Sequence, residues 1–70
     1  MQKWEYLTVD AKRTITDGTY KPLYVNGKDQ GDMSKLPTIY EYINELGGKG
    51  WDLQFYIPED HKYIFKRPIE

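Results

Sequence analysis

The sequence contains no cysteine and only one histidine, His61. Disulfide bonds and thiolate metal sites are therefore excluded, and a single imidazole cannot build a zinc cluster based on histidine. No apolar run approaches the roughly 18 residues of a membrane-spanning helix, and the first residues lack the apolar stretch of a secretory signal. We therefore expect a cytoplasmic protein that carries no metal or cofactor and does not enter a membrane.

Neither sign of charge dominates, because 10 Lys and Arg residues stand against 11 Asp and Glu residues and the formal charge is −1. Neutralising phosphates normally requires a basic surplus, so a general nucleic-acid binder is disfavoured. Aromatic residues, in contrast, make up 16% of the 70 residues. So small a core cannot enclose all of these rings, and we expect a homo-oligomer, in the first place a dimer, that covers some of them.

The segment from residue 3 to 12 is rich in Trp, Tyr, Leu, Thr and Val, which predicts a long first strand. Alternation gives this strand two faces, one with Trp4 and Tyr6 and the other with Leu7 and Val9. Either the aromatic face packs under a helix, or a bulge changes the phase along the strand. We predict the first arrangement, because Trp4 is otherwise hard to cover, and it places Leu7 and Val9 on the open face.

Residues 14–32 form a polar, turn-rich insertion between the first strand and the helix. Asn26-Gly27 indicates a two-residue hairpin turn, since Asn and Gly both tolerate positive φ angles. Short strands on either side of this turn are expected, with Pro22 permitted only at an edge or a start. The insertion either covers the open sheet face or leaves that cover to a second copy of the chain.

Apolar residues at helical spacing predict one helix of about 10–13 residues. They are Leu36, Ile39, Tyr40, Ile43 and Leu46. Ser34 or Thr38 can cap the start of this helix, and Thr38 with Glu41 matches a capping box. Tyr42 is expected to point away from the apolar stripe.

A cluster of glycines after the helix predicts a tight corner. Gly47 and Gly50 can adopt the left-handed conformation that ends a helix, and Trp51 then brings a large apolar ring to the start of the next strand. Leu53, Phe55 and Ile57 continue this strand in alternation with polar residues, which is typical of a strand packed on one side.

The closing hairpin has two possible registers. A four-residue loop would place Ile64 opposite Phe55, whereas a loop of odd length, residues 58–62, pairs Phe55 with Phe65 and Ile57 with Tyr63. We predict the odd loop, because a slip of one residue would move the aromatic set to the wrong side of the sheet.

These elements predict a single two-layer α+β domain over residues 1–70, with one helix on an antiparallel-rich sheet of three strands and residues 14–32 as an insertion. The last strand is expected between the other two and antiparallel to both. The residues expected to form the scaffold are Trp4, Tyr6, Gly47, Gly50, Trp51, Leu53, Phe55 and Phe65.

Three short motifs resemble a family of small bacterial and phage-associated proteins, domain of unknown function 4177. They are an opening Trp4-Glu5-Tyr6, a central Leu46-Gly47-x-x-Gly50-Trp51-Asp52-Leu53, in which Asp52 replaces the usual Glu, and a final Phe65-Lys66-Arg67. The resemblance covers the first strand, the helix and the closing hairpin, while residues 14–32 look like an addition. It implies a fold and no activity, since the family has no agreed function to transfer.

No group of residues points to catalysis. Asp60 and His61 are neighbours in a predicted hairpin turn and project in different directions, and Ser34 has no base to activate it. We therefore expect a protein that is not an enzyme and that self-associates, with an unknown protein or small ligand as a further partner.

The open sheet face is the expected site of interaction. The candidate residues for an interface or a ligand are Leu7, Val9, Tyr56, Ile64, Lys62, Lys66 and Arg67. An alternative use of the same face is binding of a nucleotide or single-stranded nucleic acid, because aromatic rings beside cations can stack bases and hold phosphates. Tyr63 belongs to this alternative set together with Tyr56 and the three cations.

Overall fold

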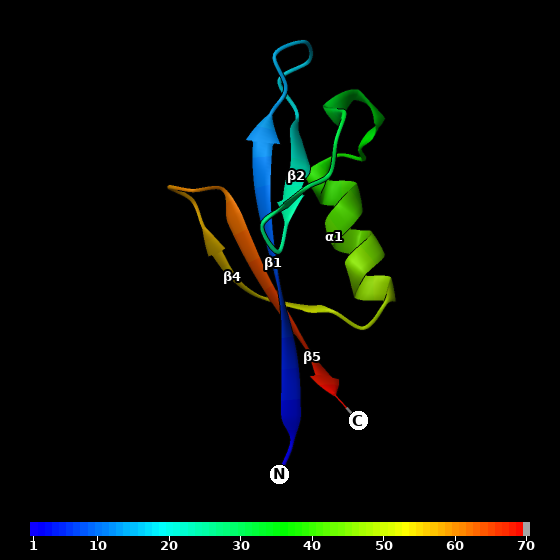
Figure 1. Cartoon of the computed structure of the whole chain (residues 1–70), viewed down its shortest axis with the longest axis vertical. Coiled ribbons are helices and arrows are strands. Elements are labelled where there is room, and N and C mark those ends of the chain that lie inside the picture. Colours follow the sequence, from blue (N-terminus) through cyan, green and yellow to red (C-terminus); the bar gives the residue numbers. More distant parts are fainter. Residues whose placement is uncertain (70) are drawn as a thin grey trace.

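The computed structural model describes residues 1–69 and shows a twisted sheet with one helix packed against part of one face (Figure 1). The strands are β1 (Lys3–Arg13), β2 (Tyr20–Val25), β3 (Lys28–Asp29), β4 (Asp52–Ile57) and β5 (Lys62–Ile69), and the helices are the short 3-10 helix η1 (Met33–Lys35) and α1 (Ile39–Gly48). The strand order is β3-β2-β1-β5-β4, with every neighbouring pair antiparallel.

The α+β class and the position of the last strand between β1 and β4 are confirmed, but the prediction of three strands is wrong. The insertion supplies the two additional strands, because β2 pairs with β1 along the edge opposite to β5. Its hairpin turn is at Asn26 and Gly27, whose φ angles of 52° and 80° are those of the expected turn. The insertion therefore widens the sheet sideways and does not form a layer over it.

Pro22 lies within β2 opposite Ala11, next to a bulge between the pairs made by Asp10 and Ala11. β3 pairs only with Tyr24 and Val25, so β2 is itself the edge of the sheet at Pro22. A missing backbone N–H breaks no strand pairing there, which is why proline is tolerated.

The face of β1 that packs under the helix is the aliphatic one. Leu7, Val9 and Ala11 are buried, and Leu7 is paired with Phe65, which is 1% exposed. Directly paired residues share a face, so Trp4 and Phe65 lie on opposite sides of the sheet. The prediction that Trp4 and Tyr6 face the helix, with Leu7 and Val9 open, is wrong.

The position of the helix explains this outcome. The N-terminal part of β1 and the C-terminal part of β5 continue together past the end of α1 (Figure 1). Trp4 stands on this projecting ribbon, beyond the reach of the helix, whereas Val9 is central and completely buried. Only one face of an alternating strand can pack against the core, and in β1 it is the aliphatic face that lies under the helix.

Helix α1 begins at the predicted capping box. Thr38 accepts a hydrogen bond from the backbone N–H of Glu41, while the Glu41 carboxylate accepts one from the backbone N–H of Thr38. Leu46 is the buried residue of the helix, and Tyr42 packs against the core while Tyr40 is exposed. The assignment of Tyr40 to the apolar stripe in place of Tyr42 is therefore wrong.

The corner after α1 is a Schellman motif. The Trp51 N–H donates to the Leu46 carbonyl at 3.0 Å, and the Gly50 N–H donates to the Gly47 carbonyl at 3.1 Å. Gly50 has a φ angle of 90°, a conformation that side chains with a Cβ rarely adopt. Trp51 is half-buried and packs against the core, as the corner requires.

The closing hairpin has neither the predicted loop nor the predicted pairs. Its turn holds four residues, 58–61, and Phe55 is paired with Ile64. A bulge at Gln54 then restores Leu53 to a position opposite Phe65. Because the bulge changes the phase once, Leu53 faces the helix side while Phe55 faces away from it.

Candidate functional site

The face of the sheet opposite α1 carries an apolar surface, which we call the open face. It is formed by alternate residues of three adjacent strands: Trp4, Tyr6 and Thr8 of β1, Ile64 and Lys66 of β5, and Phe55 and Ile57 of β4. Trp4, Tyr6 and Phe55 are 41%, 62% and 66% exposed. One helix covers one side of a sheet, so these large rings have no covering layer within residues 1–69.

Most charges on the open face are already engaged within the chain. Lys62 and Asp10 form an ion pair of 3.8 Å, and the Lys66 ammonium lies 4.1 Å from the centre of the Trp4 ring. Asp52 is the cross-strand neighbour of Lys66, and its carboxylate accepts a hydrogen bond of 2.9 Å from the Gln54 side chain. Cation and anion therefore alternate around an apolar centre, which lowers the cost of removing this surface from water.

The structure divides the predicted site residues between the two sides of the sheet. Ile64, Lys62 and Lys66 lie on the open face as expected. Leu7 and Val9 are buried under the helix, and their assignment to the interface is wrong. The aliphatic alternation of β1, which Ala11 continues, is the signal that could have placed these residues in the core and the rings outside.

Tyr56, Tyr63 and Arg67 lie on the helix side. The rings of Tyr56 and Tyr63 are stacked with centroids 4.7 Å apart, and Arg67 lies 4.2 Å over the ring of Trp51 while it forms an ion pair with Glu5. The set proposed for stacking bases and holding phosphates is therefore split between two faces.

Partial burial raises the pKa of Tyr63, and the neighbouring Tyr56 adds to this rise. A phenol at its ordinary pKa is already neutral in the physiological range, so this rise only extends neutrality of Tyr63 to more alkaline solution. Tyr63 also packs against the core, while Tyr56 is 46% exposed.

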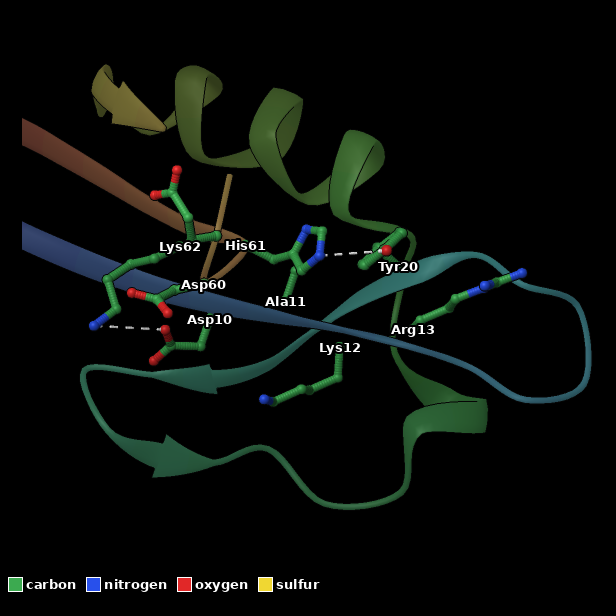
Figure 2. A pocket seen from close by; sticks show the side chains of 9 residues that line it. Asp10, Ala11, Lys12, Arg13, Tyr20, Asp60, His61 and Lys62 are labelled. Atoms are coloured by element: carbon green, nitrogen blue, oxygen red, sulfur yellow. Dashed lines mark hydrogen bonds and ion pairs between the residues drawn. The ribbon is translucent and has the colours of Figure 1, made fainter. Parts of the chain in front are cut away.

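A hollow of about 500 Å³ lies where the end of β1 meets the β4–β5 turn. Figure 2 shows the His61 ring directed toward Tyr20, with Nε2 3.4 Å from the tyrosine hydroxyl, while the side chains of Lys12 and Arg13 point away. The His61 carbonyl accepts a hydrogen bond of 2.9 Å from the Ala11 N–H.

His61 acts in this hollow as a turn residue. Its φ angle is 49°, in the left-handed region that histidine enters more readily than most residues. Its ring centre lies 4.5 Å from that of Tyr20, so the side chain fastens the β4–β5 turn to β2.

Two kinds of feature are absent from the described part of the chain. Within residues 1–69, no three His, Asp or Glu side chains gather in a way that could hold a metal ion. No helix in the same range is long and apolar enough to cross a membrane. Comparison with protein-family models, curated proteins and solved structures finds no significant match.

Proposed function

We propose that this domain is a small cytoplasmic interaction module, without enzymatic activity, that forms a homodimer through the open face of its sheet. One observation carries the proposal. The insertion could have covered the open face, but it pairs edge to edge with β1 and leaves Trp4, Tyr6 and Phe55 exposed. Exposed apolar patches of this kind mark interaction sites in soluble domains.

The charge pattern favours a second copy as the partner. An interface around a two-fold axis must be self-complementary, so a surface with a strong excess of one sign would repel its own copy. The open face carries Lys62 beside Asp10 and Lys66 beside Asp52, and the whole chain has a formal charge of −1. Apolar rings surrounded by balanced charges satisfy this requirement.

The size of the open face predicts a weak dimer. The open face extends along seven residues of β1, from Trp4 to Asp10, and across the width of three strands. These dimensions give a footprint of roughly 20 Å by 14 Å, or about 300 Å². A standard interface buries about 800 Å² of accessible surface on each partner. Projecting side chains make the accessible area of the open face larger than its flat footprint, but that area still falls below the standard value. We expect a dissociation constant on the order of 10–100 µM.

Sedimentation equilibrium tests this proposal over a protein concentration range from about 1 µM to about 1 mM. The average mass should rise from the 8.4 kDa of one chain toward twice that value. Phe55→Lys should keep the mass at that of one chain, because it places a charge inside the buried surface. Tyr40→Lys is the matched control, since Tyr40 is an exposed ring on α1, and this variant should dimerise like the natural chain.

Two results would contradict the proposal. One is a mass of 8.4 kDa for the natural chain at every concentration. The other is equal loss of association in Tyr40→Lys and Phe55→Lys, which would place the contact elsewhere.

Binding of a nucleotide or single strand remains the second candidate, and the cation over the Trp4 ring favours it. Self-association is preferred because Lys62 is already paired and Arg67 lies on the other side of the sheet. Titration with a fluorescent oligonucleotide of thymidines separates the two. Binding that weakens steeply as salt rises would favour nucleic acid, and no binding at low salt would remove this candidate.

We also propose that the resemblance to domain of unknown function 4177 reflects common descent, with a bacterial or phage origin. In support of this proposal, three motif residues have structural roles. Gly50 ends the helix, Trp51 packs against the core, and Phe65 lies at the centre of the core. The resemblance adds nothing to the choice of partner.

A further inference from the structure

Strand β4 forms one edge of the sheet and exposes apolar side chains on both of its faces. β5 pairs with one side of β4, and no strand of residues 1–69 pairs with the other. Phe55, on the open face, is 66% exposed, while Leu53 and Tyr56, on the helix side, are 40% and 46% exposed. An added strand would cover part of all three, because its own side chains would stand beside theirs on both faces.

The charges around this edge are acidic. Asp52 is exposed at the start of β4, and Glu59 and Asp60 are exposed in the turn that follows it. The nearest cations belong to β5. Lys62 forms an ion pair with Asp10, and Lys66, the cross-strand neighbour of Asp52, lies over the Trp4 ring. Both ends of the edge therefore present negative charge.

This charge pattern disfavours a second copy at the edge. In an antiparallel pair of two β4 strands, the start of one strand meets the end of the other, which brings Asp52 toward Glu59 and Asp60 of the other copy. Like charges at this separation repel. A segment with basic residues at its ends would instead find a complementary carboxylate at each end of β4.

We propose that the outer edge of β4 binds an extended peptide segment of another protein, with an apolar, β-branched centre and basic flanks, which adds a sixth strand to the sheet. The bulge at Gln54 limits regular pairing to Phe55–Ile57. Few hydrogen bonds can then form, so the expected dissociation constant is on the order of 100 µM. The edge and the open face share Phe55, but the edge binds through backbone pairing and the open face through side-chain packing, so neither proposal depends on the other.

A synthetic peptide, Lys-Arg-Val-Thr-Val-Thr-Val-Arg-Lys, tests the proposal by NMR titration of the labelled domain. Amide shifts should change along Asp52–Ile57 and much less at Trp4 and Tyr6. Alternate N–H groups of an added strand point toward the edge that it joins. N-methylation of one alternate set of the central amides should therefore abolish binding, while methylation of the other set should leave it unchanged.

A charge comparison completes the test. The same peptide with Glu in place of each Lys and Arg should bind about tenfold more weakly or worse at low salt. Glu59→Lys combined with Asp60→Lys should weaken binding of the basic peptide about fivefold or more, whereas Glu45→Lys, an exposed change on α1, should not. The spectra of the free variants verify that each is folded.

The proposal is overturned if both N-methylated peptides bind equally well, if the acidic peptide binds as tightly as the basic one, or if no amide of β4 responds at millimolar peptide. Shifts centred on Trp4 and Tyr6 would also overturn it, because they would place the peptide on the open face. Failure of dimerisation in sedimentation leaves these outcomes unaffected, so the two proposals are tested separately.

Discussion

Replacing each of the two phenylalanines with alanine tests which face of the sheet is the core. Phe65 is 1% exposed and packs with Leu7, Val9 and Leu46, whereas Phe55 is 66% exposed on the other face. Removing a buried phenyl ring costs about 3–5 kcal/mol, the sum of lost transfer free energy and the cavity that remains. Removing an exposed ring changes the free energy of unfolding by about 0.5 kcal/mol or less.

The total stability of a chain of this size is about 3–5 kcal/mol, so Phe65→Ala should leave it largely unfolded. Phe65→Leu keeps most of the apolar volume and should lower the urea midpoint measurably while the chain still folds. Phe55→Ala should unfold within error of the natural chain.

Urea unfolding is followed by circular dichroism at about 1 µM protein, where a dimer of the expected affinity is dissociated. Equal loss of stability in Phe65→Ala and Phe55→Ala would refute the assignment of faces. A larger loss in Phe55→Ala would reverse that assignment.

Two further predictions concern local hydrogen bonds. Thr38→Ala removes the side chain that caps α1 and should lower the free energy of unfolding in urea by about 1 kcal/mol. Glu41→Gln should lower it less, because a neutral amide can still accept the hydrogen bond. An unchanged free energy of unfolding in Thr38→Ala would contradict the capping role. Hydrogen bonds from the Thr14 hydroxyl and from the backbone and hydroxyl of Thr19 lower the pKa of Asp17 from 3.8 to about 2. Between these two pKa values the unfolded chain binds more protons than the folded chain. The contribution of Asp17 to the free energy of unfolding is therefore present above about pH 4 and is lost as the pH falls toward 2. Asp17→Asn should flatten the fall in thermal midpoint over that window, and an unchanged pH profile would contradict the assignment.

Local signals in the sequence predicted the local structure well. Thr38 and Glu41 marked the start of the helix, Asn26-Gly27 marked the hairpin, and the glycines before Trp51 marked the corner. Each of these signals depends on the backbone preferences of a few neighbouring residues, which can be read from the sequence itself. The order of β1, β5 and β4 was also predictable, because a crossover and a hairpin leave few alternatives.

The phases of the strands were not predictable in the same way. The size of the Trp4 ring suggested burial, but the face that is buried depends on where α1 ends, and this is a property of the whole fold. The bulge at Gln54 likewise depends on how β4 matches β5, and no short motif encodes it. β2 pairs with β1 across the polar stretch of residues 14–19. No local pattern indicates this pairing, so the sequence predicted a hairpin in the insertion but not its place in the sheet.

These errors explain which parts of the candidate site were found. An uncovered sheet face was predictable from one helix and many aromatic residues, and Ile64, Lys62 and Lys66 were placed on it. Its principal rings, Trp4 and Phe55, were assigned to the core, because a single error of phase exchanges all residues of a strand between faces.

The account depends most on self-association through the open face, and contacts between chains test it directly. A sample that mixes isotope-labelled with unlabelled protein at about 1 mM allows nuclear Overhauser effects to be filtered for contacts between chains. We predict such contacts from the side chains of Trp4, Tyr6, Phe55 and Ile64, and none from Val9. Contacts between chains that arise only from α1, or none at this concentration, would contradict the account.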